Sequence, residues 1–140
     1  MPLIACWPAK IKPGVSEALI SQVDFAATIA ALVAGKPDAT TMPDSLNVLP
    51  ALLGESKLGR DHIVEHAGRL AIRQGNWKFV PAGNTREKLG PWNDLKIPEP
   101  GYLFDLAADP AEATDLAEKH PAQVSELRAL IARIRGATPR

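Results

Sequence analysis

The stretch from Gly101 to Ala117, with the sequence GYLFDLAADPAEATDLA, constrains the fold of this chain more than any other. It begins with an apolar run typical of a strand, which an Asp-Pro step ends in a turn. An acid two residues after the proline and the following Asp-Leu-Ala sequence predict the approach to a helix, because helix N-termini favour acids. We therefore expect a strand, a turn and a helix whose polar side chains bind the backbone.

Composition excludes several classes of protein. The 140 residues are 46% hydrophobic and 23% charged, which is ordinary for a globular chain. Lys plus Arg and Asp plus Glu both number 16, so no net charge attracts nucleic acid or an anionic membrane. One cysteine excludes an internal disulfide and a Cys-rich zinc site. No apolar run approaches the roughly 20 residues of a membrane span, and the N-terminus lacks the basic region of a secretory signal.

The first part of the chain reads as a strand and a helix. The apolar run Leu3 to Trp7 predicts a buried strand. Ser21 and Asp24 have the spacing of a capping box. The alanine-rich helix behind them ends at Gly35 and carries four apolar residues on one side: Phe25, Ile29, Leu32 and Val33. A helix with so many small residues is expected to pack closely against a sheet.

After a second, shorter helix, the spacing of apolar residues changes from the period of a helix to that of strands. Asp44-Ser45 is predicted to cap that helix, which Gly54 ends. Three antiparallel strands are then expected at 62–66, 70–73 and 76–80, with a long loop from Pro81 to Pro100. A last helix begins at Pro121 and has one apolar stripe, formed by Val124, Leu127, Leu130, Ile131 and Ile134. This stripe is expected to lie on the small sheet.

Two groups of residues suggest a metal site. His62, Glu65 and His66 match the H-x-x-E-H pattern of zinc peptidases, which requires a helix to bring both histidines to one face. The β-branched residues between them favour a strand, which points Glu65 away from both histidines. Asp105, Asp109 and Glu112 could be imagined as a cation site. Turn formation and the preference of helix N-termini for acids explain their spacing better.

Five segments of the chain follow the order of similar segments in one protein family. They are PLIACWPAKI, QVDFAATI, DSLNVLPALLG, LAIRQGNWKF and the stretch from Gly101 to Ala117. The chain therefore resembles the C-terminal part of the arylsulfatase-like sulfatases, the formylglycine-dependent enzymes of the alkaline-phosphatase superfamily. In that family a Cys-x-Pro-x-Arg signature supplies the nucleophile. Cys6 does not fit it, because Lys10 stands at the arginine position, and Cys6 is interpreted as a buried strand residue.

The resemblance implies an α+β fold in two parts. Residues 1–58 would be the end of an alkaline-phosphatase-like α/β domain, with a strand, the alanine-rich helix and the short helix. Residues 59–140 would form a C-terminal subdomain in which a small antiparallel sheet packs against a C-terminal helix.

The resemblance also implies what the chain does and does not contain. It would be the C-terminal region of a sulfuric ester hydrolase, whose catalytic residues, calcium ligands and formylglycine lie upstream. We expect no catalytic or metal-binding residue here, and no activity of the chain alone. Its partner would be the remainder of the catalytic domain, and the complete enzyme would act on a sulfate ester. Complete family members are often periplasmic, secreted or lysosomal, and the chain itself has no signal peptide.

Three residues are candidates for contact with the substrate at the rim of its pocket: His66, Trp92 and Asn93. Ordinary packing and loop exposure are the alternative for each. Two other functions stay open at this point. The parent protein would be a phosphodiesterase or phosphonate hydrolase of the same superfamily, or the chain would be a stand-alone, non-catalytic binding module. A fragment of a larger sheet is expected to expose an apolar patch and to associate.

Overall fold

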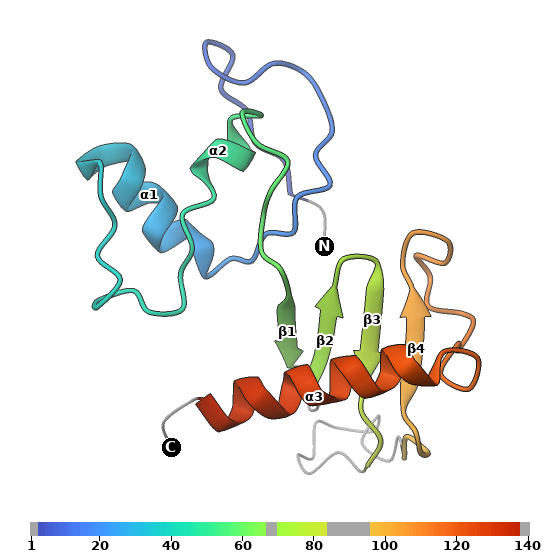
Figure 1. Ribbon diagram of the computed structural model, residues 1–140. Helices are drawn as coiled ribbons and strands as arrows, with labels where there is room; N and C mark the ends of the chain where they lie inside the picture. Colours follow the sequence, from blue (N-terminus) through green and yellow to red (C-terminus); the bar gives the residue numbers. More distant parts are fainter. Residues whose placement is uncertain (1–2, 67–69, 84–95, 138–140) are drawn as a thin grey trace. The chain divides into compact units, whose positions relative to one another are not determined.

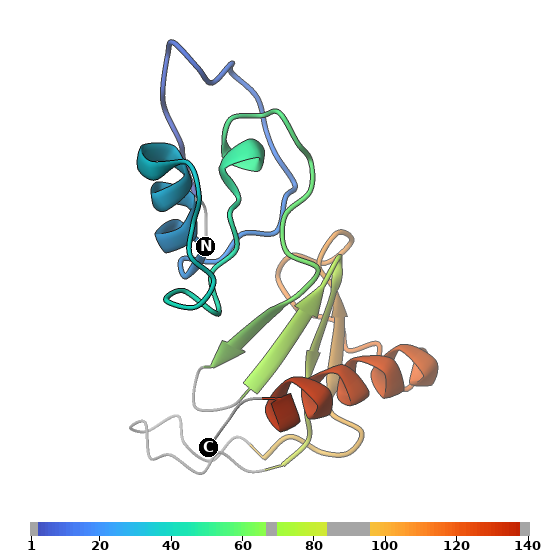
Figure 2. The same cartoon turned by 60° about the vertical axis from the view of Figure 1, so that its left-hand side comes forward.

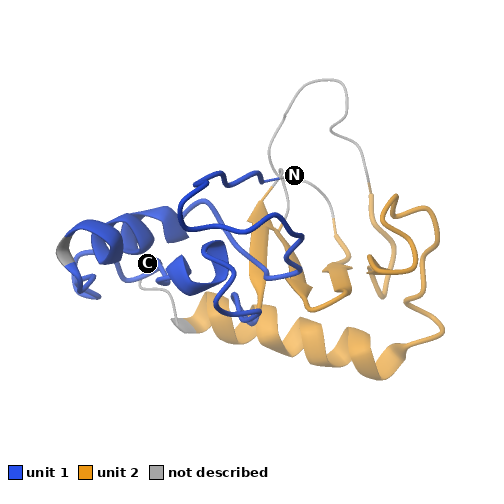
Figure 3. Ribbon diagram, turned by 90° about the horizontal axis from the view of Figure 1, so that it is seen from above, with its two compact units in different colours: residues 1–61 blue, residues 62–140 orange. Residues whose placement is uncertain are grey.

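The computed structural model describes residues 3–66, 70–83 and 96–137. The chain divides into two compact units, Met1–Asp61 and His62–Arg140, which Figure 3 shows in blue and orange. Residues 59–61, which the sequence places with the second part, group with the first unit. These residues are attached to the first unit by a hydrogen bond that the Arg60 N–H donates to the Leu19 carbonyl at 2.7 Å. Each unit is described by itself below.

The first unit contains two helices, α1 (Asp24–Ala34) and α2 (Leu49–Leu52), which contact each other (Figure 1). As predicted, α1 ends at Gly35, whose φ of 81° is the left-handed conformation that glycine adopts without a steric penalty. Three residues of α1 are almost completely buried, namely Asp24, Ala27 and Thr28. The four apolar residues predicted on one side face the other way: Ile29, Leu32 and Val33 are exposed and Phe25 is half-buried.

The caps of both helices differ from the sequence prediction. Only half of the capping box forms, because the Asp24 carboxylate accepts a hydrogen bond from the Ser21 N–H while the Asp24 N–H binds the Ser21 carbonyl. The cap predicted at Asp44-Ser45 is wrong. The Ser45 hydroxyl instead accepts a hydrogen bond from the Ala27 N–H of α1, and Asn47 accepts one from the Leu49 N–H.

The predicted strand from Leu3 to Trp7 is also wrong for this chain. The segment forms no strand, and Leu3 and Ile4 are 52% and 89% exposed. Cys6, interpreted from the sequence as a buried strand residue, is exposed as well. A strand needs a neighbour to receive its backbone hydrogen bonds, and no strand in the described residues pairs with this segment.

The second unit is built on a four-stranded antiparallel sheet, as the sequence predicts. Its strands are β1 (Ile63–His66), β2 (Leu70–Gln74), β3 (Trp77–Val80) and β4 (Tyr102–Asp105), which lie in sequence order (Figure 1). A tight turn joins β2 to β3, with Gln74 paired to Trp77 and Gly75 at a φ of 56°. Such turns require left-handed backbone, and glycine supplies it.

Helix α3 (Pro121–Ala137) covers one face of this sheet (Figure 2). Its predicted stripe is confirmed, because Val124, Leu127, Leu130 and Ile131 are at most 7% exposed and Ile134 packs at the edge. The strands contribute Ile72, Phe79 and Leu103, none of which is exposed. No helix in the part of the chain that the structure describes is long and apolar enough to cross a membrane.

The stretch from Gly101 to Ala117 forms a strand and turns, as predicted, and the helix that follows begins at Pro121, which confirms the predicted start. Its aspartates do bind the backbone. Asp105 accepts a hydrogen bond from the Ala107 N–H, and Asp109 accepts one from the Thr114 N–H. Asp115 accepts two, from the N–H groups of Leu103 and Ala117. The segment is therefore tied along strand β4 before the helix begins.

Candidate functional site

The H-x-x-E-H residues lie on strand β1 or directly before it, so the helix that a zinc peptidase requires is absent from this position. Glu65 and His66 point to opposite faces of the sheet, because neighbouring strand residues alternate. Glu65 is paired instead with Lys78, at 3.5 Å. Within residues 3–66, 70–83 and 96–137, no group of three or more His, Cys, Asp or Glu side chains is placed to hold a metal ion.

Of the three substrate-rim candidates, the structure describes one. His66 is the last residue of β1 and is exposed. Trp92 and Asn93 lie outside the described residues. His66 pairs with Leu70, the first residue of β2.

A charged cluster occupies the face of the sheet opposite α3. Lys78 of β3 donates a hydrogen bond to Glu112 at 2.6 Å and also lies near Glu65 of β1. The Lys78 side chain is only 17% exposed. Burial by itself would lower the pKa of Lys78, but the hydrogen bonds and charges of Glu112 and Glu65 outweigh it and raise this pKa above its ordinary value. The ammonium therefore stays charged and links two strands to the turn after β4.

Glu112 reaches Lys78 through an unusual backbone conformation. Its φ of 56° is left-handed, and Glu112 is the one non-glycine residue with a positive φ among those described. This conformation costs about 1 to 2 kcal/mol for a residue with a side chain. The sequence prediction that a helix N-terminus explains Glu112 is therefore wrong, because its carboxylate serves the ion pair with Lys78.

A second ion pair organises the first unit. The Asp24 side chain is fully buried and receives hydrogen bonds from the Arg60 guanidinium, whose Nη2 and Nε lie 2.6 and 2.8 Å from its two oxygens. It also accepts hydrogen bonds from the backbone N–H groups of Ser21 and Leu46. Arg60 additionally donates to the Asp44 carbonyl. Three segments that are distant in sequence thus meet at one carboxylate.

The electrostatics of Asp24 follow from these contacts. Burial alone would raise the pKa of the carboxyl group, because it disfavours the charged form. The hydrogen bond from Arg60, the two backbone N–H groups and the Arg60 charge more than compensate, so the pKa is lowered from its ordinary value of 3.8. The carboxylate is ionised at neutral pH and has a structural role within this unit.

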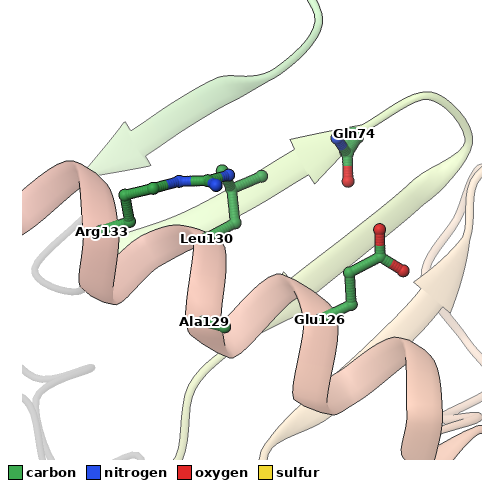
Figure 4. Close-up of a pocket in the computed structure, with 5 residues that line it drawn as sticks. All are labelled: Gln74, Glu126, Ala129, Leu130 and Arg133. Carbon is green, nitrogen blue, oxygen red and sulfur yellow. The ribbon is translucent and has the colours of Figure 1, made fainter.

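A shallow recess of about 280 Å³ lies between β2 and α3. Figure 4 shows Gln74 and Glu126 at one end and Arg133 at the other, over Leu130 and Ala129. Glu126 and Arg133 are exposed to solvent. The recess is an open surface feature with opposite charges at its two ends, and it contains no nucleophile.

Sequence reasoning missed both ion pairs. Asp24 was assigned to a helix cap, and Arg60 and Lys78 were given no role. No local pattern marks these pairs, because the partners are separated by 36 residues for Arg60 and 34 for Lys78. The one available signal was an acid at the first turn of an apolar helix, where a capping role accounts for it equally well.

No protein-family model matches the sequence. Curated proteins do match it. The chain is 36% identical over 135 residues to an N-acetylgalactosamine-6-O-sulfatase of Bacteroides thetaiotaomicron, a match that covers 94% of the chain and 26% of that protein. It is 33% identical over 130 residues to arylsulfatase A of Bos taurus and of Homo sapiens, covering 82% of the chain and 25% of each. The chain thus spans about a quarter of the length of these relatives.

Solved structures give the same result. A structure from work on the metabolism of multiple glycosaminoglycans by Bacteroides thetaiotaomicron superposes with a TM-score of 0.77 and 34% identity, over 93% of this chain and 28% of that one. The match lies in the C-terminal region of that protein. Ps i-CgsB in complex with k-i-k-neocarrahexaose superposes with a TM-score of 0.59 over 83% of this chain and 24% of that one, at 22% identity, which shows the fold alone.

Proposed function

Because this chain belongs to the sulfatase family and matches the C-terminal region of its members, we propose that it is the C-terminal part of an enzyme that hydrolyses sulfate esters. The observation that carries the proposal is the agreement of sequence and structure over almost the whole chain, at 34% identity and a TM-score of 0.77. Residues 1–58 would complete the large α/β domain, and residues 59–140 would form the C-terminal subdomain.

In this proposal the chain packs against the rest of the protein and helps to shape the substrate pocket. The rest of the protein performs the chemistry. The family implies calcium and formylglycine in the complete enzyme. The described residues do not fit either group. They hold no metal-binding cluster, and exposed Cys6 lacks the arginine of the family's signature. We therefore assign the nucleophile and the metal ligands to the remainder of the catalytic domain and expect the 140-residue chain to be inactive by itself.

The proposal is tested on the native gene product. Antibodies against residues 62–140 would capture that product from its source for measurement of its intact mass and N-terminal sequence. It would then be assayed with an aryl sulfate and with an aryl phosphate diester of the same phenol. We expect a product several times larger than 15.0 kDa that hydrolyses the sulfate faster.

Two results would overturn the proposal. Preference for the phosphate diester would favour a phosphodiesterase or phosphonate hydrolase of the same superfamily. A product of about the mass of this chain, starting at Met1 and inactive with both compounds, would favour a stand-alone binding module.

We further propose that His66, Trp92 and Asn93 contact the substrate at the rim of its pocket. The exposure of His66 at the end of β1 is compatible with this role. In the complete enzyme, His66→Ala should raise KM and leave kcat nearly unchanged, because a rim contact binds the ground state and the transition state alike. His120→Ala is the control, since His120 packs on Trp77 within the subdomain. A fall in kcat at constant KM would contradict the rim assignment.

A further inference from the structure

Strand β1 lies at one edge of the sheet, and β2 is its partner within the sheet (Figure 1). The other edge strand, β4, is tied down on its outer side. There the Leu103 N–H donates a hydrogen bond to the Asp115 carboxylate, and the Leu103 carbonyl accepts one from the Leu116 N–H. A short edge strand opens more easily than the centre of a sheet, because fewer contacts hold it. Any additional contact to β1 therefore affects its order directly.

Lys78 makes such a contact from β3, across the intervening strand β2. Glu65 of β1 pairs with Ala71 of β2. Lys78 pairs with β2 two residues further along, at Arg73, so it shares a face of the sheet with Glu65. The Lys78 ammonium lies 3.5 Å from the Glu65 carboxylate. Strand β1 thus has two connections to the sheet, its backbone pairing with β2 and this ion pair with β3.

Glu112 holds Lys78 in place. The ammonium donates a hydrogen bond at 2.6 Å to the carboxylate of Glu112, whose backbone is left-handed. A residue with a side chain keeps that conformation only where the surrounding contacts impose it. The Lys78 side chain is largely buried, so its ammonium has little freedom to move into solvent. The pair of Lys78 and Glu112 is therefore a fixed point to which Glu65 is attached.

The end of β1 carries the rim candidate His66, which directly follows Glu65. The two side chains point to opposite faces, but one strand backbone sets the position of both. A contact with a substrate depends on the position of the backbone that carries it, and a displacement of about 1 Å is enough to weaken such a contact. An interaction that fixes Glu65 therefore also fixes His66.

We propose that Lys78 is a positioning residue for the substrate pocket: held by Glu112, it fixes Glu65 and the end of β1, and so places His66 at the rim. The inference rests on the proposed function, including the assignment of His66 to the rim. In this inference Lys78 acts through β1 and does not contact the substrate.

Hydrogen exchange tests the effect on β1 in the native gene product, whatever its length. Lys78→Met removes the charge and keeps the length of the side chain, and Glu65→Gln removes one carboxylate. We expect the amides of β1 to exchange about tenfold faster in Lys78→Met and about threefold faster in Glu65→Gln, because the first change removes both ion pairs and the second removes one.

Two exposed residues of the same unit provide matched controls. Lys119→Met and Glu118→Gln make the same chemical changes and should leave the exchange of β1 unchanged. The amides of α3 are the internal reference, since general destabilisation would accelerate exchange in β1 and α3 alike. Unchanged exchange of β1 in Lys78→Met, or equal acceleration in β1 and α3, would overturn the inference.

Kinetics test the effect on substrate binding in the complete enzyme. Lys78→Met should raise KM for the aryl sulfate about as much as His66→Ala does and leave kcat nearly unchanged. A merely structural role would reduce the amount of folded enzyme and so lower the apparent kcat at constant KM. Lys78→Arg, which keeps the charge, should restore most of the original KM.

A double-mutant cycle tests whether Lys78 acts through His66. If it does, Lys78→Met should change KM by less than about twofold once His66 has been replaced by alanine. Increases in KM that multiply in the double mutant would show that Lys78 acts independently of His66, and would overturn the inference. An unchanged KM in Lys78→Met, or a fall in kcat at constant KM, would overturn it as well.

Failure of this inference is distinguishable from failure of the proposed function. A product that hydrolyses sulfate esters with a KM insensitive to Lys78→Met would overturn the inference and keep the proposed function. A product that does not prefer the sulfate ester would remove the proposed function and the inference with it.

Discussion

At the scale of the residue, Asp24 is the charged side chain that is fully buried among the described residues. Its carboxylate is fully buried and ionised, and four hydrogen-bond donors from three segments surround it. Burying a charge is costly unless it is paired and hydrogen-bonded, and here both conditions are met. The stability of the first unit therefore depends strongly on the ion pair between Asp24 and Arg60. The small apolar core of this unit cannot compensate for the loss of that pair.

In the complete gene product, replacing Arg60 by alanine should destabilise the first unit by about 3 kcal/mol, because it leaves a buried carboxylate without its counter-charge. This corresponds to about a hundredfold loss of amide protection in α1, which hydrogen exchange measures. Arg128→Ala is the control. Arg128 pairs with Glu99 at 3.1 Å, but the two side chains are 51% and 78% exposed. We expect a loss below about 1 kcal/mol there, and an equal loss in both variants would contradict the role of Asp24.

The lowered pKa of Asp24 makes the first unit sensitive to acid. Above pH 3.8 the carboxylate is ionised in the folded and unfolded chain, and its stabilisation is fully present. As the pH falls below this value, the unfolded chain binds the proton first, so stability decreases until the folded pKa is passed. Urea unfolding of the complete gene product between about pH 2.5 and 6 measures the decrease. Asp24→Asn should be less stable at pH 6 and should lack this component. If Asp24→Asn showed the same pH dependence of stability as the unchanged protein, the role of Asp24 would be contradicted.

At the scale of the element, α3 and the sheet form the principal core. Leu127 is fully buried against Ile72, Phe79 and Leu103. Leu127→Ala should lower the free energy of unfolding of the second unit by about 2 to 5 kcal/mol, because it removes buried methyl groups and leaves a cavity. Trp77, which packs against this core, reports the unfolding by its fluorescence. Arg133→Ala, on the exposed side of α3, should change stability by less than about 0.5 kcal/mol.

Elements of the second unit were predictable because each has a local pattern. Alternating β-branched and aromatic residues marked the strands, Gly75 marked their tightest turn, and a period of 3.6 marked α3. In the first unit, the same reasoning failed for Leu3 to Trp7. An apolar run shows that a segment is suited to burial, but only a neighbouring strand makes it a strand.

At the scale of the whole molecule, the two units differ in how completely their cores are formed. The second unit contains the entire cluster around Leu127. The buried hydrophobic residues described in the first unit are Ala27, Val48 and Ala51, which are small. A few small side chains do not offset the conformational entropy of an ordered chain.

Residues 62–140 expressed alone should therefore fold, and residues 1–61 should not. A two-dimensional amide NMR spectrum distinguishes the two, because a packed core disperses the signals and a disordered chain does not. We expect dispersed signals from 62–140 and a narrow cluster from 1–61. A cooperative unfolding transition of isolated 1–61 would show that its core is sufficient and would contradict this prediction.

In the candidate site, too, local contacts could be predicted from the sequence and contacts between distant segments could not. The turn roles of Asp105 and Asp109 were readable from the sequence, because each carboxylate binds a backbone N–H within five residues. The partner of Glu112 was not, because Lys78 is brought to it by the pairing of β3 with β4. Spacing along the chain has no information about such a contact.

The sequence by itself determined the order of the elements, the apolar stripe of α3 and the resemblance to the sulfatases. These features depend on local propensity and on motifs that survive in linear order. Only the tertiary structure decided that the Asp24 carboxylate is buried, that Arg60 pairs with Asp24 and Lys78 with Glu112, and which face of α1 is left uncovered. Burial and ion pairing arise from contacts between distant segments, and their energies follow from distances that exist only in the folded chain.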